Sequence, residues 1–249
     1  MNGRYDPPRP FVLSGPLTPA VRTLLIANVV VWLFQIASSL LAHVRIERLF
    51  GLVPYDVTHH LFLWQMVTYM FLHGGFFHIF LNMLALWMFG TELESLWGTE
   101  RFTRFYFITG IGAALCTVLV SWNSFVTTIG ASGATFGLLA AYGILFPERT
   151  ILLYFVIPIK VKYLVLLLGL FTFWSSVTAS GSGVAHVAHL GGMLFGWLYL
   201  RTERSGKYGA KRGFRWPNLG AWRERRRQEK LKKKFKVYYR ETRGDDSEE

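Results

Sequence analysis

Six polar side chains stand inside long apolar runs of this chain: Gln35, His78, Asn82, Ser132, His186 and His189. Polar groups in such surroundings are costly and tend to mark function. A serine hydroxyl becomes a strong nucleophile when a neutral imidazole takes its proton. Ser132 and His189 could therefore act as nucleophile and general base of a hydrolase, provided that the fold brings them together.

The charges of the chain are too few and too segregated for a soluble domain. Charged residues make up 17% of the 249 residues and hydrophobic residues 52%, whereas soluble domains carry about 25% charged residues. The ranges 57–91, 105–147 and 163–200 contain no charged residue at all. Backbone polar groups in lipid must be satisfied within helices, so the sequence predicts an all-α polytopic membrane protein.

Six spanning helices are expected from the apolar runs, since a spanning helix needs about 20 mostly apolar residues. Their predicted ranges are 20–42, 76–93, 104–121, 132–146, 162–178 and 184–200. The connector 43–75 contains an apolar stretch with Trp64 and Tyr69, which suit the membrane interface. Residues 150–159 are apolar but short and interrupted by Pro158, so we expect them at the interface too.

This pattern divides the chain into a segment 1–19, a membrane domain 20–202 and a basic tail 203–249. The loops on one side hold almost all the Lys and Arg, and the other side holds only Arg45 and Arg48. By the positive-inside rule both termini are cytoplasmic, in what we expect is a bacterial inner membrane. The tail is expected to be solvated or to touch anionic lipid headgroups. No nucleic-acid recognition motif accompanies its charge, so no nucleic-acid partner is expected.

The predicted topology brings polar groups of three helices to one depth. The second, fourth and sixth helices enter from the same side, and His78, Asn82, Ser132 and His189 then lie within roughly 10 Å of depth. His78 and Asn82 are four residues apart and share a helix face. Ser132 opens its helix, where free N–H groups favour developing negative charge. His78 and Asn82 could add further donors for an oxyanion.

Small residues line the two helices that carry Ser132 and His189. Gly133 and Gly137 repeat on one helix, and Ala185, Gly192 and Gly196 flank His189 on the other. Such stripes let membrane helices approach closely, and a contact between them would bring Ser132 and His189 within hydrogen-bond range. No Asp or Glu is placed to orient His189, so the pair would be a dyad and not a triad.

Three motifs together resemble the rhomboid family of intramembrane serine proteases, over residues 20–200. They are Gly130-Ala-Ser132-Gly133, His78-Ile-Phe-Leu-Asn82 and Ala188-His189-Leu-Gly191-Gly192. The resemblance implies a six-helix bundle with a partly embedded first loop. It implies Ser132 as nucleophile, His189 as base, and an oxyanion hole of His78, Asn82 and the Ser132 N–H. Substrates would be transmembrane proteins, and no cofactor or metal is expected.

The resemblance also concerns three residues with rings: Phe136, His186 and His73. Some rhomboids carry a tyrosine where this chain has Phe136, and the phenyl ring is expected to keep the packing against the base. His186 is the rival for the base, but the motif around His189 fits the family pattern better. His73 corresponds to a loop histidine of the family that is expected to be structural.

Three alternatives stay open at this point. An inactive rhomboid-like protein would bind clients without cutting, although such relatives usually lack the serine or the histidine. A haem or metal protein could use His73, His78, His186 and His189 as ligands. A transporter is the third, but no inverted repeat and no intramembrane carboxylate supports it.

Overall fold

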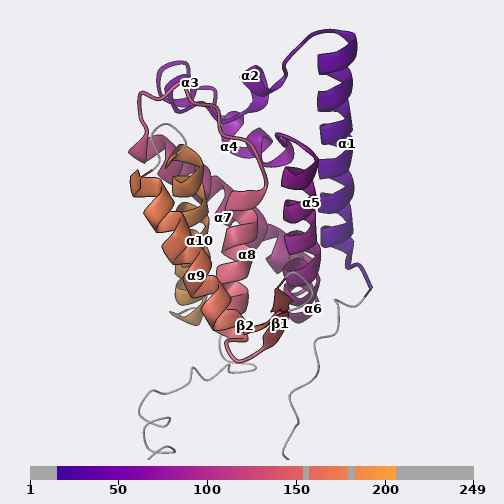
Figure 1. The fold of residues 1–249 in the computed structure, drawn as a ribbon, viewed down its shortest axis with the longest axis vertical. Helices are drawn as coiled ribbons and strands as arrows, with labels where there is room; N and C mark the ends of the chain where they lie inside the picture. The colour runs from indigo at the N-terminus through magenta and orange to yellow at the C-terminus, as the bar shows by residue number, and fades with distance from the viewer. Residues whose placement is uncertain (1–15, 154–156, 179–182, 206–249) are drawn as a thin grey trace, which may run out of the picture. The chain divides into compact units, whose positions relative to one another are not determined.

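The computed structural model of the chain describes residues 16–153, 157–178 and 183–205 (Figure 1). The predicted tail beyond 205 and the first 15 residues of the predicted N-terminal segment lie outside these ranges. In chain order the described elements are α1 (Pro19–Leu41), α2 (Glu47–Phe50), α3 (Pro54–His59), α4 (Gln65–Thr68), η1 (Tyr69–Phe71), α5 (Phe76–Ala85), η2 (Leu86–Gly90), α6 (Thr91–Trp97), α7 (Thr99–Val120), α8 (Ser132–Leu145), β1 (Thr150–Leu153), β2 (Ile157–Lys160), α9 (Val161–Thr178) and α10 (Gly183–Ser205). The elements up to Thr202 form one compact unit.

Four helical stretches of the described residues are long and apolar enough to cross a bilayer: Pro19–Leu41, Phe76–Trp97, Thr99–Val120 and Val161–Thr178. The chain is thus a polytopic helical membrane protein, as predicted. Helix α8 is apolar but has only 14 residues, and α10 is not among the four. The count of six spans therefore stays a prediction.

Helix α9 exposes a large apolar surface that is suited to contact with lipid. Only 17% of its apolar window is buried inside the protein, and large apolar side chains cover its outer side. More than half exposed are Leu166, Leu167, Leu170, Phe171, Phe173, Trp174 and Val177. In water this surface would drive aggregation, but hydrocarbon tails solvate it without cost.

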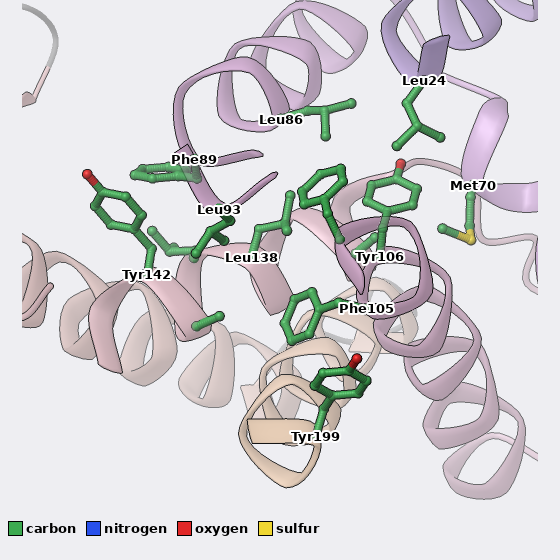
Figure 2. Close-up of a cluster of buried hydrophobic side chains, with 14 of the residues drawn as sticks. Leu24, Met70, Leu86, Phe89, Leu93, Phe105, Tyr106, Leu138, Tyr142 and Tyr199 are labelled. Carbon is green, nitrogen blue, oxygen red and sulfur yellow. The ribbon is translucent and has the colours of Figure 1, made fainter. Parts of the chain in front are cut away.

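Helix α7 supplies the centre of the buried apolar cluster (Figure 2). Phe102, Phe105 and Tyr106 have no exposed surface. Leu138 of α8 and Tyr199 of α10 belong to the same cluster, and the Phe105 and Tyr199 rings meet edge to face with centroids 5.2 Å apart. Lipid tails are as apolar as these side chains, so close packing and dispersion favour the bundle more than loss of water does.

Glycines on α8 allow α7 to come close. A Cβ built at Gly137 would lie 2.6 Å from Cβ of Thr109, and one at Gly133 would lie 2.6 Å from Cβ of Ala113. Small residues at such contacts let helix backbones approach in membranes. The first two turns of α8 are therefore held against α7, and this contact places Ser132.

The helix Phe76–Trp97 is not uniform, because its middle part η2 is π-helical. Gly90 ends this part, and a Cβ there would lie 3.0 Å from Val21 of α1 and 3.2 Å from Phe102 of α7. A π-helical turn holds one residue more than an α-helical turn. The side chains before and after η2 consequently do not follow one continuous α-helical face.

Glu94 of α6 joins the starts of two other helices. Its carboxylate accepts hydrogen bonds from the N–H groups of Ala20 and Val21, both at 2.9 Å, and from the hydroxyls of Thr18 at 2.5 Å and Thr99 at 2.7 Å. The first N–H groups of a helix have no carbonyl partner within the helix, and a negative charge there is favourable. Glu94 therefore caps α1 and ties it to the start of α7.

The connector between α1 and α5 folds into short helices at one end of the bundle (Figure 1). The side-chain oxygen of the buried Gln65 accepts the Val53 N–H at 2.9 Å, and its amide group donates to the Leu49 carbonyl at 3.3 Å. Two N–H···O bonds of 2.9 and 2.8 Å pair Leu52 with Thr128. The connector is thus fixed to the segment that leads into α8.

The segment after α8 forms an antiparallel hairpin of β1 and β2, in which Leu152 pairs with Pro158. The sequence did not predict strands here. Each strand of a two-stranded hairpin has one edge without a partner, so a proline that lacks an N–H can be accommodated. The hairpin lies at the opposite end of the bundle from the connector (Figure 1).

A small charge cluster closes the base of this hairpin. The amino groups of Lys160 and Lys162 donate to the Glu148 carboxylate at 2.8 and 2.5 Å. These hydrogen bonds hold the pKa of Glu148 below its usual range. Arg149 beside it pairs with Glu92 of α6, which links the hairpin to the helix Phe76–Trp97.

Candidate active site

Ser132 is the first residue of α8 and follows a turn that requires glycine. Gly130 has φ of +124°, in the region that residues with a side chain rarely adopt. Its N–H donates to the Tyr69 carbonyl at 2.9 Å, and a Cβ on it would lie 2.6 Å from Nε2 of His78. The turn places Ser132 where the N–H groups of the first helical turn lack intrahelical partners.

His189 of α10 reaches the serine from the neighbouring helix. Its Nε2 lies 2.8 Å from Oγ of Ser132, and both residues are half-buried. A neutral imidazole with an unprotonated Nε2 accepts the hydroxyl hydrogen at this distance. The geometry is that of a nucleophile in contact with its base.

Contact between backbones brings these two side chains together. A Cβ at Gly192 would lie 1.9 Å from the Gly133 carbonyl oxygen, and one at Gly196 would lie 2.9 Å from that of Gly137. The two stripes of small residues therefore meet as the sequence predicted. Because no side chain separates the two backbones, α10 lies close enough for His189 to contact Ser132.

The ring of His189 is held flat against a phenyl ring. Phe136, one turn after Ser132, stacks on it with centroids 4.2 Å apart and planes 1° apart. This is the contact that the sequence predicts for Phe136. His186 meets His189 edge to face at 6.1 Å, so it flanks the ring that contacts Ser132.

His78 of α5 lies on the other side of the Gly130 turn. Its Nδ1 accepts the Gly74 N–H at 3.2 Å. A neutral imidazole that accepts at Nδ1 carries its proton on Nε2. That Nε2 faces Gly130, since a Cβ there would come within 2.6 Å of it and within 3.7 Å of Oγ of Ser132. His78 therefore directs an N–H donor to the turn that carries the serine.

Asn82 lies one turn after His78 and is buried. Its amide nitrogen donates to the His78 carbonyl at 2.9 Å, which leaves its second N–H available. Its oxygen accepts from the hydroxyl of Thr135 at 3.3 Å, and that hydroxyl also lies 3.1 Å from the Ser132 carbonyl. Thr135 could not be identified from the sequence, because a threonine in an apolar helix resembles ordinary packing.

His73 supports the same turn from the connector. Gln35 of α1 accepts the His73 N–H at 3.0 Å and donates to the His73 carbonyl at 2.9 Å. The Ala131 N–H points to Nε2 of His73 at 3.5 Å. From the sequence, Gln35 could be identified only as a polar residue within an apolar helix. In the structure it holds His73 beside Ala131, the residue before Ser132.

The histidines named for the haem hypothesis form two ring pairs. His73 and His78 have centroids 5.1 Å apart, and His186 and His189 6.1 Å. Nε2 of His189 is hydrogen-bonded to Ser132 in this structure. Among the described residues, no three His, Cys, Asp or Glu side chains form a group that could hold a metal ion.

Comparison with known proteins agrees with the polytopic helical fold. Residues 60–205, more than half of the chain, match the family model described as Rhomboid domain. The chain belongs to the rhomboid family. The matched range contains His78, Asn82, Ser132 and His189, whereas Gln35 lies before it.

Rhomboid proteins of several organisms resemble the chain. It is 36% identical to "Rhomboid protein 1, mitochondrial" of Saccharomyces cerevisiae over 140 residues, which are 52% of this chain and 38% of that protein. It is 29% identical to "Rhomboid protease GluP" of Bacillus subtilis over 151 residues, 59% of this chain and 28% of that protein. With "Putative rhomboid protease YdcA" of the same bacterium it shares 29% over 183 residues, 73% of this chain and 87% of that protein.

The matched region spans well under half of the yeast rhomboid and of GluP. The similarity to these proteins therefore concerns the rhomboid domain and not their remaining parts. The YdcA match covers most of both chains. All three similarities agree with an integral membrane protein.

Proposed function

We propose that this rhomboid is a serine endopeptidase that cleaves other membrane proteins in or near their transmembrane segments. The observation that carries the proposal is the 2.8 Å contact between Oγ of Ser132 and Nε2 of His189 in a bundle of apolar helices. The family match and the relatives whose names call them rhomboid proteases support it.

In the first step Nε2 of His189 takes the proton of Ser132 while Oγ attacks the carbonyl carbon of the scissile peptide bond. Phe136 keeps the imidazole plane fixed during this transfer, because the two rings are parallel at 4.2 Å. The protonated His189 then gives its proton to the leaving amine. Water completes the cycle by hydrolysing the acyl-enzyme with His189 again as base.

The negative charge that develops on the carbonyl oxygen needs donors beside Ser132. We assign this role to the N–H of Ser132 at the start of α8, to Nε2–H of His78, and to the second N–H of Asn82. The tautomer of His78 follows from the hydrogen bond that its Nδ1 accepts from Gly74. Preorganised donors of this kind supply a large share of the rate in acyl transfer.

The substrates that fit this site are membrane proteins, because the dyad lies among helices whose outer surface is apolar. We further propose a bacterial plasma membrane with both termini cytoplasmic. The concentration of Lys and Arg in the loops of one side supports the cytoplasmic termini, and the similarity to two proteins of Bacillus subtilis supports a bacterial membrane. The relatives include bacterial and mitochondrial proteins.

A cleavage assay in liposomes with a model single-span substrate tests the proposal. Wild type should cut, and Ser132→Ala and His189→Ala should each lose activity by about 1,000-fold or more, since the two residues act as a unit. His186→Ala is the matched control and should retain most activity, because His186 does not supply the nitrogen that contacts Ser132.

Two results would overturn the proposal. One is cleavage by Ser132→Ala at the wild-type rate. The other is a folded wild-type protein that captures the single-span substrate without cutting it, which is the behaviour of an inactive rhomboid-like protein.

A further inference from the structure

A second polar site, which does not include Ser132 or His189, lies at the end of α1. A cavity of 470 Å³ is lined there by Ser39, Arg45, Glu47, Arg48 and Thr127. These residues come from the last turns of α1, from the start of the connector, and from the segment before α8. The proposed protease activity uses none of them.

Two guanidinium groups dominate the lining. The topology predicted from the sequence puts Arg45 and Arg48 on the side of the membrane that has no other Lys or Arg in its loops. Neither guanidinium is among the ion pairs that the described residues form. Paired N–H donors of arginine match the oxygens of a phosphate group. The cavity is therefore suited to a phosphate-bearing ligand.

The lining of the same cavity also includes a hydrogen-bond acceptor, the carboxylate of Glu47. Oε1 of Glu47 accepts from the amide of Gln35 at 2.7 Å, but Oε2 is buried with no hydrogen-bond partner among the described residues. The last torsion of a glutamate is broad, so the carboxylate can turn toward the cavity. A ligand with a primary ammonium would supply both a donor and a compensating charge.

Apolar side chains stand next to this polar lining. Leu40 and Leu41 follow Ser39 on α1 and are 71% and 85% exposed, and Val44 before Arg45 is 52% exposed. A soluble phosphate compound would gain nothing from them. The acyl chains of a lipid would cover them while its headgroup occupied the cavity.

We propose that this cavity binds the headgroup of a phospholipid that carries a phosphate and a primary ammonium, as phosphatidylethanolamine does. Arg45 and Arg48 hold the phosphate, and Glu47 accepts from the ammonium. The acyl chains lie against the apolar residues at the end of α1. This binding does not depend on protease activity.

Native mass spectrometry of the full-length protein in detergent tests the site. Phosphatidylethanolamine, phosphatidylcholine and phosphatidylglycerol with identical acyl chains are compared. Phosphatidylethanolamine should be retained about tenfold better than the other two, because only its headgroup combines a hydrogen-bond donor with a positive charge. Phosphoethanolamine and inorganic phosphate, added alone, distinguish a lipid site from a soluble-anion site and should bind far more weakly.

Substitutions in the cavity lining test the role of each charged residue. Arg45→Gln with Arg48→Gln should weaken all three lipids, whereas Glu47→Gln should abolish the preference for phosphatidylethanolamine and leave phosphatidylcholine unchanged. The amide oxygen that Glu47→Gln introduces can still accept from Gln35, so the connector stays in place. Arg22→Gln, near the other end of α1, is the matched control and should bind as wild type. Thermal unfolding verifies that each variant is folded.

Three outcomes would overturn the inference. The first is equal retention of the three lipids by wild type. The second is binding of inorganic phosphate as tightly as phosphatidylethanolamine, which would make the cavity a soluble-anion site. The third is displacement of the lipid by an acidic peptide at equal concentration, which would make it a protein-binding site.

Discussion

The imidazole of His189 lies parallel to the phenyl ring of Phe136, with planes 1° and centroids 4.2 Å apart. The proposed base is thus oriented by an aromatic face and not by a carboxylate. The stacking contact fixes the plane of the imidazole in which Nε2 points to Ser132. Orientation by a carboxylate in a triad is here replaced by packing.

Removal of this face should slow catalysis without unfolding the protein. Phe136→Ala should lower kcat about threefold to tenfold, the equivalent of one aromatic stacking contact. Phe136→Tyr keeps the ring and should stay near the wild-type rate. The measurement is kcat in liposomes, with Phe173→Ala on the exposed side of α9 as control. Wild-type kcat in Phe136→Ala would show that the stacking does not orient the base.

A single methyl group between α8 and α10 should separate the dyad. Gly192→Ala places a Cβ against the Gly133 backbone, which cannot yield. We expect a loss of about 100-fold in kcat, since a shift of about 1 Å has this effect on a reacting pair. Gly169→Ala on α9 is the control, because its Cβ would lie 3.6 Å from Met193 and meet no backbone. Equal activity of both variants would refute the role of the backbone contact.

Thr135 should act as a positioning residue for Asn82. Thr135→Val keeps the shape but removes the hydroxyl that Asn82 accepts from, so kcat should fall about fivefold, the equivalent of roughly 1 kcal/mol. KM should not change, because the oxyanion exists only in the transition state. Thr135→Ser should restore kcat. Thr117→Val controls for loss of a buried threonine, because the Thr117 hydroxyl donates to the Ala113 carbonyl of its own helix. A rise in KM at constant kcat would contradict this role.

Glu94 should contribute to stability and not to chemistry. Glu94→Gln leaves donors of α1 and α7 without a charged acceptor, and we expect a loss of about 2 kcal/mol in the free energy of unfolding. Glu100→Gln, which removes an exposed pair with Arg104, should cost less than about 1 kcal/mol. Unfolding titrations in mixed micelles measure both. Equal free energies of unfolding for Glu94→Gln and Glu100→Gln would argue against the capping role.

The parts of the site that follow helical periodicity could be predicted from sequence. Spacing alone puts His78 and Asn82 on one face, and the small-residue stripes around Ser132 and His189 predict the contact of their helices. These inferences need only the rise and turn of a helix and the close approach of glycines.

The parts that depend on irregular chain could not be predicted in this way. Gln35 meets His73 only because the connector folds into short helices, and no periodicity encodes that path. The hydrogen bond between Thr135 and Asn82 requires the rotation of α8 about its axis, which the contact with α7 determines. The hairpin of β1 and β2 was missed because Pro158 reads as a strand breaker, whereas at an edge it is tolerated.

The π-helical segment η2 separates two tasks within the one helix Phe76–Trp97. Residues before it face the site, where His78 and Asn82 lie, and Glu94 after it caps α1. Each residue of an α-helix turns the chain by about 100°. If Leu86–Gly90 were wound as a regular α-helix with the same number of residues, Glu94 would be turned by about that angle away from α1. The additional residue acts as an angular spacer between the site and its anchor.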